Sequence, residues 1–148
     1  MNDEQAVAEL VAHFGEGSGM PTAKQWADIL AGPAEAPLCI INLVKLRTQA
    51  EDGSSIAAAR TGLEAFLQYG AGSLPRINAA GGTMAFSGRI AGQLVGDDAD
   101  DWDLGVVVRW PNRRAMLSLF QDPAYRAAFP HRRAAVARYR ATVITAAG

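Results

Sequence analysis

The side chains of this chain that could do chemistry are few and are scattered along the sequence. His131 and Arg132 stand side by side near the carboxyl end. Imidazole titrates near neutral pH, so His131 is the candidate catalytic residue, as a general base. A surface or helix-capping histidine would explain the same position. Arg132 is a candidate ligand contact or, alternatively, a structural ion-pair partner.

Further polar side chains lie on one predicted strand, residues 37–47. Asn42 shares a strand face with apolar neighbours, where an unpaired buried amide costs about 1–3 kcal/mol, so it needs hydrogen-bond partners. Those partners are either a structural network or the carbonyl or carboxylate of a ligand. Lys45 and Arg47 follow at the end of the strand, where they are candidate anion contacts or simply solvated side chains.

Three aromatic residues complete the candidate ligand-binding set. Tyr69, Trp102 and Tyr125 combine a flat apolar ring with a polar tip, which is a usual composition for the wall of a small-molecule cleft. Ordinary core packing explains them equally well. The sequence therefore predicts ligand binding by Asn42, Lys45, Tyr69, Trp102, Tyr125 and Arg132.

Several catalytic signatures are missing from the chain. It contains no HExxH, CxxC, P-loop, GxGxxG or GxSxG sequence, so zinc hydrolase, nucleotide-binding and α/β-hydrolase functions lack their required groups. No group of residues demands a metal, and we expect no cofactor. Haem is left open, because two histidines are present but neither is placed convincingly as a proximal ligand.

Composition indicates one soluble domain. The chain has 148 residues, of which 49% are apolar and 20% charged, and no run approaches the roughly 18 apolar residues of a membrane span. The first residues carry acids where a secretory signal would be basic. The single cysteine, Cys39, cannot form an internal disulfide, and its apolar neighbours predict a buried strand thiol. We therefore expect a cytoplasmic protein.

The charges are distributed unevenly along the chain. Residues 1–108 hold six Lys/Arg against 14 Asp/Glu, whereas residues 109–148 hold eight arginines against one acid, Asp122. Either the two sets complement each other on the folded surface, or the basic end attracts an anionic ligand. Nucleic acid is not expected as a partner, because the overall charge is −1 and no nucleic-acid-binding motif is present.

Hydrophobic periodicity predicts a helical lead-in over residues 1–34, made of two short helices separated by a glycine-rich turn. Four strands follow, at residues 37–47, 83–95, 102–110 and 139–145. Helical patterns lie between them at 55–69, which carries Ile56, with a further turn at 74–80, and at 113–120, with restarts at Asp122–Pro123 and at Pro130.

The order of these elements predicts an α+β fold, the βαββαβ arrangement of a ferredoxin-like domain with a four-stranded antiparallel sheet. We expect residues 1–34 to form an N-terminal helical extension and residues 35–148 to form this domain. Both faces of the first strand are largely apolar, although the helices should cover only one face of the sheet. A homodimer that packs sheet against sheet is the simplest way to cover the other face.

The segments INLVKLR, WDLGVVVRWPNRRA, DPAY and PHRRAA, in this serial order, resemble the dimeric α/β-barrel superfamily, in particular a branch of unknown function related in fold to antibiotic-biosynthesis monooxygenases. The resemblance covers residues 38–144 and places Arg132 at the arginine of a family motif. It implies a homodimer with a barrel-like core and a cleft between each sheet and its helices. The superfamily includes cofactor-independent oxygenases, haem proteins and isomerases, so the fold names no reaction.

Three hypotheses follow for the function. In the first, the protein binds a small organic ligand, with an anionic ligand as one option, and works as a cofactor-independent enzyme of the monooxygenase or isomerase type. In the second, it is a non-catalytic dimeric module that binds a metabolite or serves in a stress response. In the third, assembly itself, through the dimer or the lead-in helices, is the whole function.

Overall fold

The computed structural model describes residues 1–52 and 59–146, so the predicted position of Ile56 lies outside the described residues. The chain begins with two helices and a strand, continues with a helix and two consecutive strands, and ends with two consecutive helices and a last strand. In chain order the elements are α1 (Asp3–Phe14), α2 (Ala23–Leu30), β1 (Leu38–Leu46), α3 (Gly62–Ala79), β2 (Thr83–Arg89), β3 (Leu104–Trp110), α4 (Arg113–Gln121), α5 (Pro123–Ala135) and β4 (Val136–Thr145).

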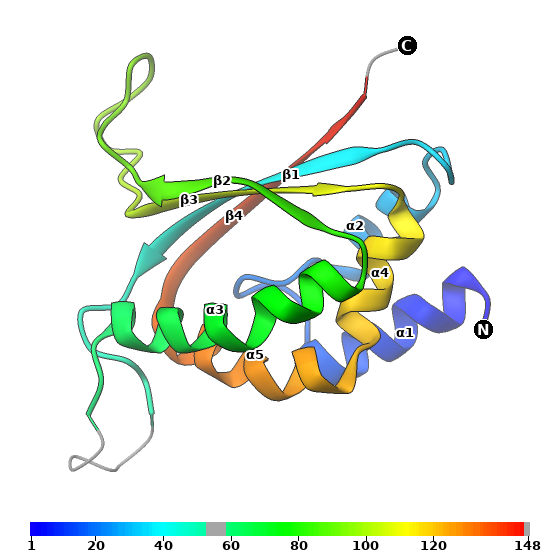
Figure 1. The fold of residues 1–148 in the computed structure, drawn as a ribbon, viewed down its shortest axis with the longest axis horizontal. Helices are drawn as coiled ribbons and strands as arrows, with labels where there is room; N and C mark the ends of the chain where they lie inside the picture. Colours follow the sequence, from blue (N-terminus) through cyan, green and yellow to red (C-terminus); the bar gives the residue numbers. More distant parts are fainter. Residues whose placement is uncertain (53–58, 147–148) are drawn as a thin grey trace.

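The four strands form one antiparallel sheet in the order β2-β3-β1-β4. Helices α3 and α5 run side by side beneath one face of this sheet, and α4, α2 and α1 lie on the same side (Figure 1). None of these helices covers the opposite face, and the loop after β2 projects away from it (Figure 1). The α+β class and the four-stranded antiparallel sheet are therefore confirmed, whereas a barrel formed by two copies stays a prediction.

Local sequence signals explain where the helices begin. Asn2, Thr22 and Thr61 each accept a hydrogen bond from the backbone three residues later, and a Gln or Glu there bonds back to the cap, which satisfies otherwise orphaned helix N–H groups. Asp122 caps α5, with Pro123 in its first turn as expected. Arg76 holds this carboxylate at 2.7 Å, and the hydrogen bond lowers the pKa of Asp122.

Two helices run on where the sequence predicted breaks. α3 continues through Gly70, Gly72 and Pro75 as a single helix, and α5 continues through Pro130. Packing outweighs propensity here, because a Cβ at Gly72 would lie 2.9 Å from the Cβ of Ala128, so the glycine lets α3 approach α5 closely. Two helices, α4 and α5, occupy the interval between β3 and β4 that the βαββαβ pattern assigns to one.

Four predictions about the strands also need correction. β4 begins at Val136 rather than at residue 139, and β2 ends at Arg89 rather than at residue 95. The register slips between Met84 and Phe86, so the bulge lies before the glycines that predicted it. Cys39 is only half-buried, because it points to the sheet face that the described helices leave uncovered.

The lead-in helices belong to the main core. Leu10, Phe14 and Trp26 are at most 3% exposed and join the same hydrophobic cluster as Trp110 and Tyr125. The division at residue 34 remains a prediction about folding units, but the apolar packing is continuous across it.

Arginines from the carboxyl half of the chain hold the lead-in in place. Arg126 forms two hydrogen bonds with the Glu9 carboxylate at 2.6 and 2.8 Å, and Arg114 lies 2.6 Å from Asp3. The basic and acidic parts of the sequence thus complement each other in these pairs.

No described helix combines the length and apolar character needed to cross a membrane.

Candidate functional site

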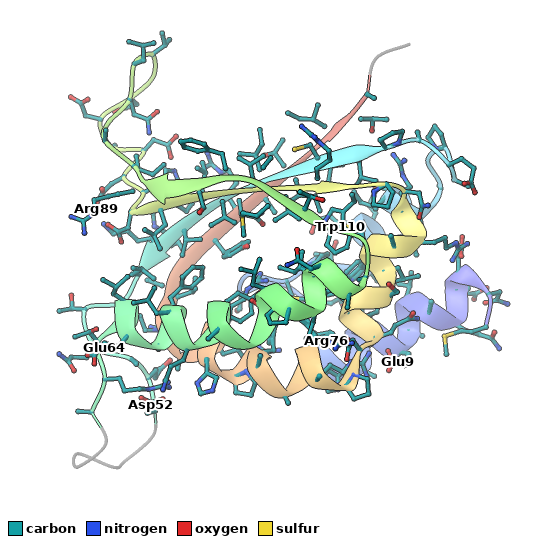
Figure 2. The ribbon with its side chains drawn as sticks, viewed as in Figure 1. Glu9, Asp52, Glu64, Arg76, Arg89 and Trp110 are labelled. Atoms are coloured by element: carbon teal, nitrogen blue, oxygen red, sulfur yellow. The ribbon has the colours of Figure 1, made fainter. Side chains whose placement is uncertain are left out.

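A cavity of about 690 Å³ lies between the sheet and the helices α3, α4 and α5. Its size falls within the range that small-ligand pockets occupy. Figure 2 shows Trp110 and Arg89, two of its lining residues, toward opposite ends of the space between the sheet and α3. Apolar side chains form most of the wall, among them Ile40, Phe66, Ile77, Met84, Val106, Val108, Met116 and Leu119.

The cavity opens between α3 and the edge strand β2. Leu63 and Leu67 of α3, which are 40% and 63% exposed, line it, and so does the exposed Arg89 of β2. The lining residues farther in, including Tyr69, Tyr125 and Arg132, are buried. A ligand would therefore pass apolar side chains before it reached the polar groups of the interior.

Arg132 of α5 supplies the only buried charge of the described cavity wall. The residue is 7% exposed, its guanidinium lies 3.9 Å from the ring centroid of Tyr139, and its Nη2 donates to the Gly19 carbonyl at 2.7 Å. Within residues 1–52 and 59–146, no carboxylate oxygen lies within 4.0 Å of the Arg132 guanidinium, so it forms no ion pair there. A buried charge without a counter-ion is costly, so this position is a candidate site for an anion.

Tyrosine hydroxyls and one amide surround this guanidinium. The hydroxyls of Tyr69 and Tyr125 lie 2.7 Å apart in the buried interior. The hydroxyl of Tyr139 donates to Oδ1 of Asn42 at 2.7 Å, and Nδ2 of Asn42 donates to the Val106 carbonyl at 2.9 Å. In the tyrosine pair one hydroxyl donates to the other, which leaves the proton of the accepting hydroxyl available to a ligand.

Burial keeps the phenols of Tyr125 and Tyr139 protonated. It raises the pKa of Tyr139 to about 12 and the pKa of Tyr125 well above its usual value, although the charge of Arg132 opposes both shifts. Burial lowers the pKa of Arg132, but interactions with Tyr139, Tyr69 and Tyr125 outweigh it and leave that pKa above its ordinary value. At neutral pH the polar end therefore presents neutral phenols beside a full positive charge.

This arrangement suits the binding of an oxygen anion better than the abstraction of a proton. Among the described residues, the cavity wall contains no Asp, Glu, His, Lys or Cys side chain. The guanidinium and the spare phenol proton are hydrogen-bond donors, and a charge-assisted hydrogen bond is about twice as strong as a neutral one. The described wall therefore combines donors for an anion with an apolar surface for an organic body.

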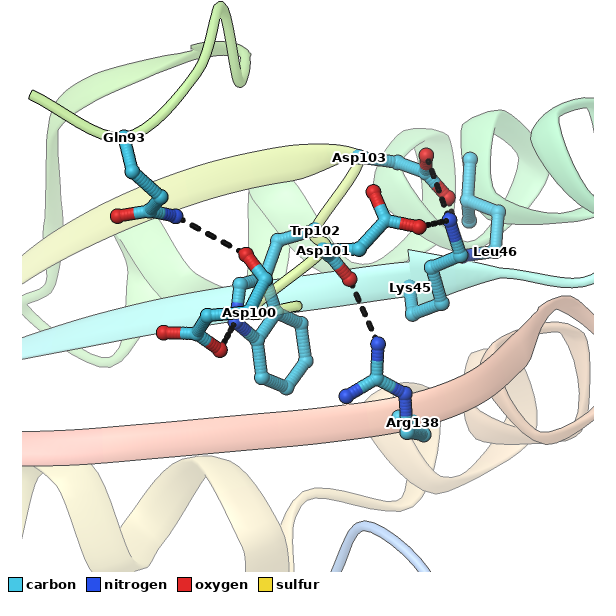
Figure 3. A network of polar contacts seen from close by, with 8 residues as sticks. All are labelled: Lys45, Leu46, Gln93, Asp100, Asp101, Trp102, Asp103 and Arg138. Atoms are coloured by element: carbon cyan, nitrogen blue, oxygen red, sulfur yellow. Dashed lines mark hydrogen bonds and ion pairs between the residues drawn. The ribbon is translucent and has the colours of Figure 1, made fainter. Parts of the chain in front are cut away.

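Four of the candidate residues come together in this cavity: Asn42, Tyr69, Tyr125 and Arg132. Lys45 and Trp102 do not line it. Lys45 points to the opposite face of the sheet, where its Nζ lies 2.7 Å from Asp101 and 3.5 Å from Asp103 (Figure 3). Hydrogen bonding to Asp101 raises the pKa of Lys45.

Trp102 packs on that same opposite face. The guanidinium groups of Arg138 and Arg140 lie 4.6 and 5.1 Å from its ring centroid, and its indole nitrogen donates to Asp100 at 2.5 Å. Figure 3 shows the contacts that link Arg138 through Asp101 to Lys45. Cation–π and ion-pair contacts thus account for the burial of Trp102 without a ligand.

His131 also lies outside the cavity. Its Nδ1 is 2.9 Å from Nη1 of Arg60, which in turn pairs with Asp52. Because successive residues of a helix point in different directions, Arg132 turns inward whereas its neighbour His131 faces the loop that carries Arg60. The candidate general base is therefore not placed where it could act on a ligand in this cavity.

Tyr139 was not among the predicted site residues, although the sequence carried a signal for it. Tyr139 lies opposite Val44 in the β1–β4 register, and Val44 is fully buried on the helix side of the sheet. The alternation of residues in β4 showed that Tyr139 shares a face with Ala141 and Val143. The register that pairs Tyr139 with Val44 could not be read from one strand alone.

Comparison with known proteins finds relatives of similar structure but no protein of known activity among those described below. The chain matches no protein-family model, and no curated protein matches it significantly. It is similar to the methylated form of the RPA0582 protein, with 31% identity and a TM-score of 0.79 over 89% of this chain and 96% of that chain. A second structure of RPA0582, described as a protein of unknown function from Rhodopseudomonas palustris, gives 31% identity and 0.78 over 90% and 99%.

A dimeric ferredoxin-like protein of unknown function from Thermobifida fusca is more distant. It is 20% identical, with a TM-score of 0.48, over 75% of this chain and 92% of its own.

Proposed function

Because this chain belongs to the same family as RPA0582 of Rhodopseudomonas palustris, whose function is unknown, we propose a function from the cavity itself: it binds a small organic anion. The observation that carries the proposal is the buried, unpaired guanidinium of Arg132 at the wall of a largely apolar cavity. The apolar body of the ligand fills the space toward α3 and β2. Its carboxylate or other oxygen anion meets Arg132, with the Tyr69–Tyr125 pair as a further donor.

Simple binding fits the cavity better than catalysis. A cofactor-independent enzyme that moves a proton needs a group that exchanges it with the substrate, and the described wall offers phenols, serine hydroxyls and guanidinium groups but no carboxylate, imidazole, amine or thiol. Burial raises the pKa of Tyr125 and Tyr139, so both are acids rather than bases at neutral pH. We therefore favour the non-catalytic, metabolite-binding hypothesis over the monooxygenase-like or isomerase-like one.

The test compares 4-phenylbutyrate with its uncharged amide, which has nearly the same shape. We expect the protein to bind the carboxylate at least about tenfold more tightly, because a charge-assisted hydrogen bond to a buried guanidinium exceeds a neutral one by about 1.4 kcal/mol or more. Isothermal titration calorimetry gives both affinities. Arg132→Gln should bind the two compounds almost equally.

Arg89→Gln is the matched control for that experiment. Arg89 also lines the cavity but is exposed at its mouth, where solvent screens its charge, so this variant should keep most of the preference for the carboxylate. Equal binding of the two compounds by the unaltered protein, or an unchanged preference in Arg132→Gln, would contradict the proposal. Thermal unfolding of each variant shows whether the fold is retained.

We also infer that the protein forms a homodimer through the uncovered face of the sheet. Ile41 and Val107 pair across β1 and β3 on this face, and Phe86 of β2, 75% exposed, is the cross-strand partner of Val107. Ile144 of β4 is 50% exposed on the same face. A contiguous apolar area of this kind favours association with another surface.

The dimer is tested by light scattering after size-exclusion chromatography over a range of concentrations. We expect twice the 15.6 kDa of the chain, and we expect Ile41→Glu to give the monomer mass because a carboxylate would be buried without a partner in the interface. Leu67→Glu, which changes an apolar residue 63% exposed on α3, should remain dimeric. A monomer at every concentration, or a dimeric Ile41→Glu, would count against this interface.

A further inference from the structure

A second pocket, of about 320 Å³, shares only Arg132 with the main cavity. Three segments build it: the turn between α1 and α2 with Ser18, the end of β1 with Arg47, and α5 with Arg133. Glu51 stands beside them. The pocket therefore brings together residues that the sequence separates by more than 80 positions.

The charges around this pocket are unbalanced. Three arginines (Arg47, Arg132 and Arg133) face one carboxylate, Glu51, which leaves an excess of two positive charges. Nη2 of Arg47 lies 3.2 Å from Glu51, whereas Arg132 and Arg133 donate to the backbone carbonyls of Gly19 and Phe14. Among the described residues, no carboxylate forms an ion pair with either Arg132 or Arg133.

The side chain of Arg47 is only partly engaged by its carboxylate neighbour. It is 36% exposed, and among the described residues its ion-pair contact is the one between Nη2 and Glu51. Its Nε is closed off from the pocket, so only the outer nitrogens of the guanidinium can reach a ligand there. Glu51 offers its carboxylate only to the neighbouring Nη2, and its side chain is 72% exposed, so it can move aside.

We propose that this pocket binds a phosphate dianion, either free or at the end of a small phosphate monoester. Guanidinium groups match the tetrahedral oxygens of phosphate with paired N–H donors, and while no anion occupies the main cavity beside Arg132 the excess of two positive charges balances its two negative charges. The outer nitrogens of Arg47 donate to one oxygen once Glu51 moves aside, and the guanidinium groups of Arg132 and Arg133 supply the remaining charge. Ser18 offers a hydroxyl at the edge of the pocket.

The experiment is a titration with inorganic phosphate, followed by isothermal titration calorimetry at constant ionic strength set with chloride. We expect saturable binding, at least about tenfold weaker binding in Arg47→Gln, and tighter binding in Glu51→Gln, which removes the competing carboxylate. Arg114→Gln is the charge-matched control, because Arg114 pairs with Asp3 on α1 and does not line the pocket. It should bind phosphate as the unaltered protein does.

The affinity for phosphate is expected to fall in Arg47→Gln and to rise in Glu51→Gln. A general effect of net charge would produce the same two changes, so the comparison with Arg114→Gln distinguishes local binding from net charge. An equal loss in Arg114→Gln and Arg47→Gln, an unchanged affinity in Glu51→Gln, or the absence of saturable binding would overturn the proposal. Phenyl phosphate, titrated in parallel, binds more tightly than inorganic phosphate if the natural ligand is a monoester, and no more tightly if it is free phosphate. Arg47 does not line the main cavity, so Arg47→Gln should leave 4-phenylbutyrate binding unchanged whether or not phosphate binds.

Discussion

An Arg113→Ala variant is expected to lose about 3 kcal/mol or more of its free energy of unfolding. Arg113 is 6% exposed at the start of α4 and donates to the carbonyls of Ile29 and Pro33 at 2.6 and 2.9 Å and to Oγ1 of Thr145 at 3.2 Å. Each hydrogen bond to a charged group contributes about 1.5–3 kcal/mol, and the acceptors would be left without this partner. In a chain of this length the melting temperature should fall by roughly 6–12 °C.

The next residue provides the control. Arg114 has a side chain that is 57% exposed and pairs with Asp3 on the surface, so Arg114→Ala should cost only about 0.2–1 kcal/mol. Arg113→Lys keeps the charge but cannot make three directed contacts, and we expect an intermediate loss. Similar small losses in Arg113→Ala and Arg114→Ala by urea denaturation would contradict the role of Arg113 as the clamp that holds α2 against α4.

Trp26→Ala should destabilise the protein by about 3–5 kcal/mol, the usual cost of removing a large aromatic side chain from a core. Trp26 of α2 is 2% exposed, and its ring packs edge to face on Phe120 of α4 with 5.1 Å between centroids. The same measurement tests whether residues 1–34 fold with the rest of the chain. If they formed an independent appendage, this variant would leave the main urea transition unchanged.

Two controls separate packing from other effects of that substitution. Leu94→Ala changes a fully exposed leucine in the loop after β2 and should alter stability by no more than about 0.5 kcal/mol. Trp26→Phe keeps an aromatic ring and removes an indole N–H that has no acceptor among the described residues, so its cost should be much smaller than that of Trp26→Ala.

Much of the fold could be predicted because its signals are local. The predicted caps at Thr22 and Asp122 act over two or three residues, and strand alternation in β1 placed Asn42 and Val44 on one face. The failures lay where packing overrode propensity. α3 runs through Gly70 and Pro75 because its contact with α5 stabilises the whole helix, which no local pattern reveals.

The sequence predicted the kinds of residue that line the candidate site, but it did not identify all of those residues correctly. Lys45 and Trp102 have the residue types of a ligand site, yet both lie on the far face of the sheet. There Lys45 pairs with Asp101, and Trp102 packs against the guanidinium of Arg138. Tyr139 was overlooked although it lies 3.9 Å from Arg132. Residue type indicates what a side chain can do, whereas its partners depend on strand register and on the direction in which each helix presents its residues.

The sequence by itself determined the α+β class, the starts of α1, α2, α4 and α5, the apolar faces of the strands and the excess of arginine near the carboxyl end. Only the tertiary structure decided which arginines stay without a counter-ion among the described residues. Arg126 and Arg114 meet acids of α1, while Arg132 turns into the cavity among the three tyrosines. The physical reason is that local signals act over a few residues, whereas the charge balance of Arg132 depends on side chains from α3, α5 and β4 that meet only when the sheet and helices pack.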